Sequence, residues 1–522
     1  MTSRPIPQLV FASICASALC FAPPLQADVK LPALISDHMV LQQEAQANVW
    51  GTAEPGEKVT VKLAGFEAAA TADDRGDWNV RILGVKAGPA GDMTIQGSNT
   101  LTVKDVMMGE VWVCSGQSNM EFAVSGANDA ATEIAAAKYP EIRLFTVPRL
   151  AAEEATREVR GEWKICSPET VGSFSAVAYF FGRDLFEKLK VPIGLIHSSW
   201  GGTGAELWTP EEVIAAVPSF KERYQDRWEQ IKTDYPKAKE TYDRQMDEWK
   251  VAAEKAKADG QPSPRQPGLP KGGTPEGSPG SLFNGMIVPL LPYTIQGAIW
   301  YQGESNAGDA KLYRSLFPMM IRSWRAAWSK GGLGASDNPD FPFLYVQLAN
   351  FMARHDQPGE SAWAELREAQ LLTLQLPRTA MAVAIDIGEE KDIHPKNKQE
   401  VGRRLALGAE ATVYYLETEY SGPIIAGSQP EGDHIRLSFR HGQGMKAADG
   451  GEIKGFSIAG QDGKFVWAQV EIDGDHVLVS SSEVKEPVAV RYGWADNPEG
   501  NLVNEAGLPA SPFRTDGDDS GL

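Results

Sequence analysis

Three residue types in this chain are suited to nucleophilic catalysis at a carbonyl carbon. Ser118 has a hydroxyl that becomes a nucleophile when a neighbouring base takes its proton. Histidine is the usual base near neutral pH, and His394 is the candidate because Asp392 stands two residues before it. The attack creates an oxyanion, which needs hydrogen-bond donors about 3 Å away. The backbone N–H groups of Ser118 and Gly202 and the side-chain amide of Asn306 can supply them.

The spacing of these residues indicates one shared place in the fold. Each belongs to a polar cluster that follows a short apolar run, as a buried strand would provide. In an open parallel sheet the carboxyl ends of all strands lie at one edge, where ligands bind. Four clusters that are distant in sequence are therefore expected to meet there. The clusters are residues 116–120 after the run 111–114, 198–203 after 193–196, 302–306 after 298–300, and 392–395 soon after 382–385.

Other residues of the same clusters are candidates for contacts with a substrate. They are Gln117, Trp200, Gln302 and Glu304. An aromatic wall for a sugar ring is a further hypothesis, although aromatic residues near strand ends more often belong to the core. Its members would be Trp200, Trp208, Trp300 and Tyr301. His197 stands at a predicted strand end, where we expect a hydrogen-bonded structural residue rather than a second base.

Each candidate also has a purely structural interpretation. Ser118 and Glu121 match the S-x-x-E pattern of a helix capping box. Asn306 can serve as an N-cap, and His394 precedes a proline that suits the first turn of a helix. Gly202 can be an ordinary turn glycine. For any one of these residues alone the structural interpretation is strong, but four clusters at equivalent positions favour a shared site.

The sequence predicts three parts after a short leader. Residues 28–104 alternate polar and apolar side chains between turn clusters, which predicts a β-sandwich domain. Residues 105–420 alternate apolar runs with helical segments, which predicts an α/β core with a parallel sheet covered on both faces. A charged segment and a Pro- and Gly-rich stretch at about 215–280 interrupt the core, as a helical hairpin or one long helix followed by a loop. Residues 421–522 return to alternation and predict a β-rich C-terminal domain.

The leader, residues 1–27, has the features of a secretory signal. Arg4 precedes an apolar stretch at 9–21, and Ala27 supplies the small residue that signal peptidase requires. We therefore expect an exported protein, secreted or periplasmic, cleaved near Ala27. No later run is long and apolar enough to suggest a membrane span.

The composition excludes several classes of partner. With 50 basic and 69 acidic residues, the formal net charge is −19, which argues against a nucleic-acid partner. After the leader only Cys114 and Cys166 remain, and the sequence leaves open whether they pair. Metal-ligand spacing such as C-x-x-C is absent. We expect neither a metal nor another cofactor.

Taken together, the clusters resemble the SGNH hydrolase superfamily. The shared features are Gly-Gln-Ser-Asn, a glycine after the second core strand, an asparagine, and a late histidine near an aspartate. Three longer blocks at 111–121, 300–306 and 392–396 look like the sialate O-acetylesterase family, and the resemblance extends over nearly the whole mature chain. It implies a flavodoxin-like α/β core and ester hydrolysis. It also implies roles for named residues: nucleophile Ser118, base His394, oxyanion donors Gly202 and Asn306.

One position departs from the superfamily pattern. The superfamily places its aspartate three residues before the histidine, where this chain has Lys391, while Asp392 is two residues before it. Asp392 can still orient the imidazole of His394, as the third member of a triad does. Alternatively, a backbone carbonyl orients the ring and leaves a Ser–His dyad.

The resemblance implies an O-acetylated sugar or glycan as the substrate, with O-acetylated sialic acid as the first expectation. A sialate site should contain a cation for the sugar's carboxylate, and Arg354 and Arg367 are candidates. Acetyl xylan esterases share similar blocks and act on neutral sugars, so they are the first alternative. The second alternative is a non-catalytic carbohydrate-binding protein in which the core is a relic.

Overall fold

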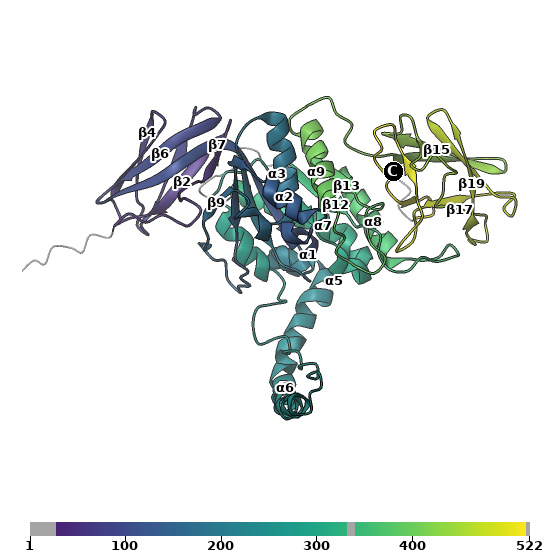
Figure 1. Cartoon of the computed structure of the whole chain (residues 1–522), viewed down its shortest axis with the longest axis horizontal. Helices are drawn as coiled ribbons and strands as arrows, with labels where there is room; N and C mark the ends of the chain where they lie inside the picture. Colours follow the sequence, from purple (N-terminus) through teal and green to yellow (C-terminus); the bar gives the residue numbers. More distant parts are fainter. Residues whose placement is uncertain (1–27, 331–339, 518–522) are drawn as a thin grey trace, which may run out of the picture.

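The computed structural model describes residues 28–330 and 340–517. Three parts lie in a row along the longest axis: a β-rich N-terminal part, a central part with helices around a sheet, and a β-rich C-terminal part (Figure 1). The expected leader, residues 1–27, lies outside the described residues. Within the two described ranges, no helix combines the length and the apolar character that crossing a membrane requires.

The N-terminal part contains two sheets. In β3 (Lys58–Leu63), buried Val59, Val61 and Leu63 alternate with more exposed residues, so the strand turns one face to the core as its alternating sequence predicts. Strands β2 and β5 pair antiparallel in a sheet of their own, while β1, β3, β4 and β6 connect to β7. The bounds are β1 (Val40–Gln42), β2 (Ala47–Thr52), β4 (Phe66–Thr71), β5 (Asp77–Ile82) and β6 (Gly88–Gln96).

Strand β7 (Thr100–Gly116) joins the N-terminal part to the core. Its first half pairs antiparallel with β6, and its second half, from Glu110 onward, pairs parallel with core strands on both sides. The strand therefore runs through position 104, the predicted end of the N-terminal domain. Ser118 follows two residues after the carboxyl end of β7.

The core sheet has the strand order β13-β12-β11-β7-β10-β8-β9. All of these pairings are parallel except that of β8 with the edge strand β9. The chain fills the side of β7 that holds β8 and β10 before it crosses to β11, so β7 is the point at which the strand order reverses. The bounds are β8 (Tyr139–Thr146), β9 (Trp163–Cys166), β10 (Ile193–Ser199), β11 (Gly297–Tyr301), β12 (Phe343–Gln347) and β13 (Thr379–Val383).

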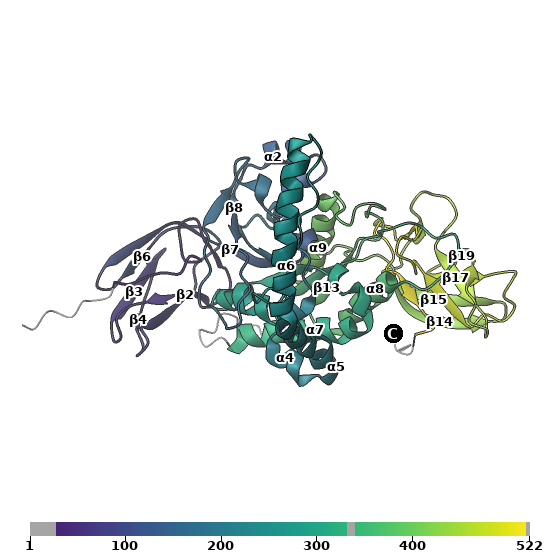
Figure 2. The same cartoon turned by 90° about the horizontal axis from the view of Figure 1, so that it is seen from below.

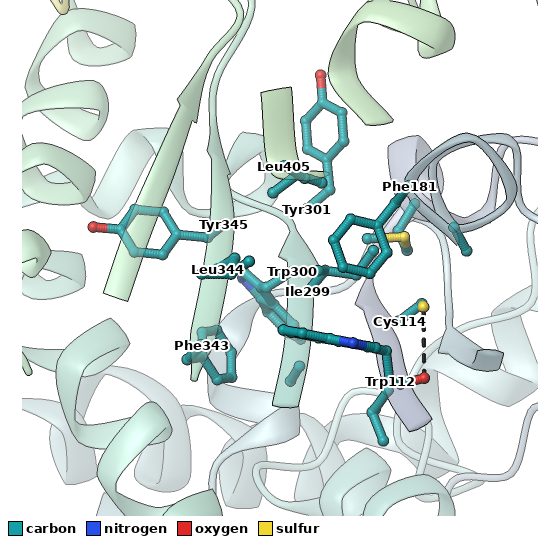
Figure 3. Packing of buried hydrophobic residues seen from close by; sticks show 14 of the residues in the cluster. Trp112, Cys114, Phe181, Ile299, Trp300, Tyr301, Phe343, Leu344, Tyr345 and Leu405 are labelled. Carbon is teal, nitrogen blue, oxygen red and sulfur yellow. Dashed lines mark hydrogen bonds between the residues drawn. The ribbon is translucent and has the colours of Figure 1, made fainter. Parts of the chain in front are cut away.

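Helices cover both faces of this sheet, which explains why its strands are apolar on both sides. On one face, Trp112 of β7 packs edge-on against Phe181 of α3, with ring centroids 5.1 Å apart. On the other face, Trp300 of β11 packs against Phe317 and Trp324 of α7. Figure 3 shows Trp112, Phe181 and Trp300 in this core. The bounds are α2 (Ala130–Ala136), α3 (Ala176–Leu189), α7 (Ala310–Lys330), α8 (Ala362–Leu372) and α9 (Lys398–Thr412). The predicted fold class, a covered parallel sheet flanked by β-rich parts, is confirmed.

The two cysteines outside the leader are both free and buried. Cys114 lies on β7 inside the core, and Cys166 ends β9. Burial raises the pKa of Cys166 to about 12, so its thiol stays protonated and unreactive near neutral pH. The pairing that the sequence left open is not made.

The insertion in the core is one long helix rather than a hairpin. Helix α6 (Arg227–Ala258) projects away from the core and is preceded by α4 (Glu211–Ala216), α5 (Pro218–Phe220) and the π-helical turn η4 (Lys221–Asp226) (Figures 1 and 2). The Pro- and Gly-rich stretch then returns along the helix. The indole N–H of Trp249 donates to the Pro264 carbonyl at 2.8 Å, so this aromatic residue joins the helix to the returning stretch.

The C-terminal part is built from antiparallel sheets. One has the order β14-β15-β20-β19, another has the order β18-β17-β21-β23, and a third consists of β16 and β22. A partly buried ion pair between Arg514 and Glu368 of α8 ties this part to the core. The bounds are β14 (Ile424–Glu431), β15 (His434–Arg440), β16 (Lys446–Ala447), β17 (Phe456–Ala459), β18 (Val466–Trp467), β19 (Gln469–Asp473), β20 (His476–Ser480), β21 (Ala489–Tyr492), β22 (Leu502–Val503) and β23 (Phe513–Arg514).

Candidate active site

Ser118 and His394 lie in hydrogen-bond contact although 276 positions separate them in the sequence. Ser118 is the first residue of the short helix α1 (Ser118–Glu121). Its Oγ is 2.8 Å from Nε2 of His394, the distance of an ordinary O–H···N hydrogen bond. The N-cap of α1 is Gln117, and no side chain caps the helix, so the capping-box interpretation of Ser118 is wrong. The serine hydroxyl instead faces a base that can take its proton.

Asp392 lies beside His394 and holds its backbone. Its Oδ1 accepts a hydrogen bond from the His394 N–H at 2.9 Å. The same oxygen is 3.6 Å from the ring Nδ1, which is close enough for attraction to an imidazolium but too long for a hydrogen bond. The helix-cap interpretation of His394 is wrong as well, because α9 begins at Lys398 and Asn397 caps it.

The loop after β10 packs against the nucleophile. The Trp200 N–H donates to the Gly116 carbonyl at 3.1 Å, and the Gly201 N–H donates to Oε2 of Glu121 at 3.0 Å. A Cβ on Gly201 would lie only 3.1 Å from the Cβ of Ser118. Glu121, which the sequence suggested as half of a capping box, therefore holds this loop beside Ser118.

Gly202 is the point at which this loop opens. Its φ of +74° lies in the left-handed region, which favours glycine. A Cβ built on Gly202 meets no atom within 4 Å, so the space in front of it is open. The backbone at this position is thus accessible to an incoming group, as an oxyanion donor requires.

Asn306 is buried in the helical turn η7 (Glu304–Asp309), and its amide is held in one orientation. Its Oδ1 accepts from the Ala205 N–H at 2.9 Å and from Nε2 of Gln302 at 2.6 Å. Its Nδ2 donates one N–H to Oε2 of Glu206 at 2.9 Å. The N-cap interpretation is wrong, because the following helix α7 begins at Ala310.

Three of the predicted substrate contacts hold loops together instead. Gln117 is buried, and its Oε1 accepts from the Ser305 N–H at 3.3 Å. Gln302 is fully buried and donates to Asn306 and to the Thr203 carbonyl. Glu304 directs its carboxylate to Asn119, not to open space. Each of the three side chains bridges two of the polar clusters.

The aromatic residues near the site divide into core and rim. Trp200 is half-buried, and the guanidinium of Arg149 lies 5.6 Å from the centre of its ring. Arg149 also pairs with Glu121, with Nε 2.8 Å from Oε1. The remaining members of the hypothetical sugar wall are buried in the core, as their place near strand ends suggested: Trp208, Trp300 and Tyr301.

His197 is not placed to act as a second base. Its ring is buried on β10, where Nε2 bonds the Ser199 hydroxyl at 2.5 Å. Burial lowers the pKa of His197 to about 4, so the ring stays neutral near neutral pH. This outcome agrees with the structural role that we expected for it.

Two further side chains, which the sequence pattern did not single out, touch the site. Asn119 follows the nucleophile, and Lys398 begins α9; both are buried and bonded to each other. Asn119 stands within the Gly-Gln-Ser-Asn block, so its position was visible although its partner was not. Lysine is rarely buried, so the sequence offers no signal for a buried ammonium at Lys398.

Comparisons with known proteins identify the family. The pattern of the family described as carbohydrate esterase, sialic acid-specific acetylesterase, matches residues 282–410, which include Asn306 and His394. The sialate O-acetylesterase of Mus musculus is 33% identical over 425 residues, covering 75% of this chain and 74% of that protein. The chain belongs to the sialate O-acetylesterase family. The sialate O-acetylesterase of Homo sapiens is 31% identical over 424 residues, covering 75% of this chain and 72% of that protein.

A solved structure shares the whole architecture. A carbohydrate acetylesterase from Xanthomonas citri is 37% identical, with a TM-score of 0.79, and the match covers 94% of this chain and 100% of that one. The sialate O-acetylesterase family and this likeness show that the chain is an esterase with an SGNH-type core flanked by β-rich parts. The alternative of a non-catalytic carbohydrate-binding protein is therefore wrong.

Proposed function

We propose that this protein is an exported serine esterase that removes O-acetyl groups from sugars through an acetyl-enzyme, with O-acetylated sialic acid as the first substrate to test. The observation that carries the proposal is the 2.8 Å contact between Ser118 Oγ and His394 Nε2. It lies beyond the carboxyl end of β7, where the strand order reverses and where α/β sheets of this kind bind ligands. Export rests on the signal-like leader, residues 1–27.

In the first half of the reaction the acetyl group moves to the enzyme. His394 Nε2 takes the hydroxyl proton of Ser118, and Oγ forms a bond to the acetyl carbonyl carbon. The carbonyl oxygen becomes an oxyanion that accepts hydrogen bonds from the N–H groups of Ser118 and Gly202 and from the amide of Asn306. The bond from carbon to the sugar oxygen then breaks, and His394 gives its proton to that oxygen.

In the second half, water releases the acetyl group. His394 takes a proton from a water molecule, whose oxygen attacks the acetyl carbon and regenerates the oxyanion at the same donors. The bond to Ser118 Oγ breaks, the serine recovers the proton from His394, and acetate leaves. Every proton transfer in this reaction passes through His394.

A specific observation also favours a neutral sugar, as in acetyl xylan esterases. Both candidate cations for a sialate carboxylate are engaged elsewhere. Arg367 is fully buried and donates to the carbonyls of Leu348, Ala349, Ala495 and Asp496. Arg354 is exposed and pairs with Glu499. A substrate without a carboxylate needs no such cation.

A side-by-side assay distinguishes the two substrates. The purified protein is incubated with O-acetylated sialic acid and, separately, with acetylated xylan, and the released acetate is measured. Turnover of the sialic acid with little turnover of xylan supports the first substrate, and the reverse result supports the neutral sugar. Release of acetate from neither sugar, by a chain that hydrolyses nitrophenyl acetate, would contradict the sugar deacetylase proposal.

Replacement of Asp392 by asparagine is expected to lower kcat by about 10- to 100-fold, less than the loss of a fully bonded triad carboxylate. The reason is that Asp392 lies 3.6 Å from the ring Nδ1, so it stabilises the imidazolium by charge more than by a hydrogen bond. Steady-state kinetics with nitrophenyl acetate measure the change. A kcat equal to that of the wild type would indicate a Ser–His dyad instead.

Replacement of Asn306 by leucine is expected to lower kcat by about 10²- to 10³-fold, as the loss of one oxyanion donor typically does. KM is expected to change little, because the donor acts on charge that develops in the transition state. The variant Gln302→Leu removes a donor to Asn306 Oδ1 but keeps the Asn306 amide, so a smaller loss of kcat is expected. If Asn306 to leucine raises KM and leaves kcat intact, the residue binds substrate and does not stabilise the oxyanion.

A further inference from the structure

A buried network of side chains lies next to the Ser118–His394 contact. Asn119 is 1% exposed, and its Nδ2 donates to Oε1 of Glu304 at 2.6 Å and to the Ile393 carbonyl at 3.0 Å. Its Oδ1 accepts from Nζ of Lys398 at 2.5 Å. One amide thus joins the loop of the nucleophile, the loop of Asn306 and the loop of His394.

Lys398 is completely buried, which is rare for a lysine. Its ammonium lies 5.0 Å from the ring centre of Phe122 and 5.3 Å from that of Tyr301. Burial lowers the pKa of Lys398 to about 7, although the carboxylate of Glu304 acts in the opposite direction, and burial raises the pKa of Glu304. Buried groups perturbed in this way concentrate at functional sites.

The network acts on a single peptide unit. The carbonyl of Ile393 and the N–H of His394 belong to the same planar peptide. Asn119 donates to the carbonyl, and Asp392 accepts from the N–H at 2.9 Å. Both polar groups of the peptide that carries His394 are therefore held.

Lys398 and Glu304 also decide which way the Asn119 amide faces. A protonated Lys398 has only donors, and an ionised Glu304 has only acceptors, so in these charge states each can bond only one end of the amide. The oxygen must turn to Lys398 and the nitrogen to Glu304, which leaves the second N–H directed at Ile393. With the amide reversed, its oxygen would face the Ile393 carbonyl and repel it.

We propose that Asn119, Glu304 and Lys398 are positioning residues that hold His394 at hydrogen-bond distance from Ser118. None of the three touches the reacting atoms in the proposed mechanism. Their effect is on the geometry of the base, and a displacement of about 1 Å at a catalytic group can cost about 100-fold in rate. This inference rests on the proposed function.

The test measures kcat and KM for nitrophenyl acetate in variants of the full chain. Lys398→Met and Asn119→Leu keep side-chain size but remove the network, and each is expected to lower kcat by about 10- to 100-fold with KM within about twofold. Glu304→Gln keeps an oxygen that accepts from Asn119 and is expected to stay within about threefold of the wild type. Glu304→Leu removes that acceptor, so its kcat is expected to fall as far as the kcat of Lys398→Met.

Arg325→Met is the matched control. Arg325 is also a buried cation, but it donates to the carbonyls of Phe341, Pro377 and Arg378, which precede the amino ends of β12 and β13. The Arg325→Met variant is expected to unfold at a lower urea concentration and to keep the wild-type kcat. An equal loss of kcat in Arg325→Met would show that any lost buried cation has this effect, and it would overturn the inference.

Two further outcomes are decisive. Wild-type kcat in both Lys398→Met and Asn119→Leu, with Ser118→Ala inactive, would overturn the inference and leave the proposed function standing. Wild-type turnover in Ser118→Ala would overturn the proposed function itself. If Lys398→Met does not fold, the comparison of Glu304→Gln with Glu304→Leu decides, because equal kcat in those two variants contradicts the inference.

Discussion

Replacement of Ser118 by alanine is expected to lower kcat by about 10⁵- to 10⁶-fold, as the loss of an activated serine does in other serine hydrolases. Oγ of Ser118 is the atom that bonds the acetyl group in the proposed mechanism, and among the described residues it is the hydrogen-bond partner of His394 Nε2. Release of acetate from an acetylated sugar measures the effect. Binding of the sugar is expected to survive, because the substitution removes one hydroxyl and leaves the other groups of the site in place.

The fold of this variant is expected to persist. Ser118 makes no cap bond in α1, so its loss removes one hydrogen bond to a partly exposed ring. Ser323→Ala is a suitable control, since the Ser323 hydroxyl donates within its own helix, to the Met319 carbonyl. Retained turnover in Ser118→Ala, or an equal loss in Ser323→Ala, would contradict the assignment of the nucleophile.

Replacement of His394 by glutamine is expected to reduce kcat by about 10⁵-fold, close to the effect of losing the serine. Glutamine cannot accept the serine proton, so Ser118 would remain a weakly nucleophilic alcohol. The double variant, Ser118→Ala with His394→Gln, is expected to be no slower than either single variant, because the two residues act as a unit. Steady-state kinetics of the three variants test this.

His434 provides the control for this experiment. It lies on β15 in the C-terminal part and contacts Glu431 and Asp433, so His434→Gln is expected to leave kcat unchanged. If the losses of the two single variants add fully in the double variant, Ser118 and His394 act in separate steps, and the proposed base is wrong.

Much of the fold was predictable because burial sets the pattern of residues. The apolar runs that fall in β10, β11 and β13 are buried on both faces of the sheet, and helices cover both faces. The long strand β7 was harder to predict. Its alternating first half and its uniformly buried second half look like two strands in two domains, and only the pairing with both β6 and β10 shows that they are continuous.

The candidate site also has residues that could be predicted from the sequence and contacts that could not. The residues with proposed catalytic roles follow core strands in the chain, so they could be found from type and position: Ser118 comes two residues after β7, Asn306 five after β11 and His394 eleven after β13. Side chains such as Gln302 and Glu304 carry the same polar groups as a substrate contact, and only the fold shows that they face other loops. Asp392 lies 3.6 Å from the imidazole, a few tenths of an ångström beyond hydrogen-bond distance. Such small differences depend on packing and are not encoded in a local sequence pattern.

The most direct measurement is the site of reaction with a serine-directed phosphonate. The treated protein is digested, and the modified peptide is identified by mass spectrometry. We expect one adduct, on the peptide that contains Ser118, together with complete loss of activity, and no adduct when His394 is replaced by glutamine. An adduct on a different serine, or full activity in a protein labelled at Ser118, would contradict the account.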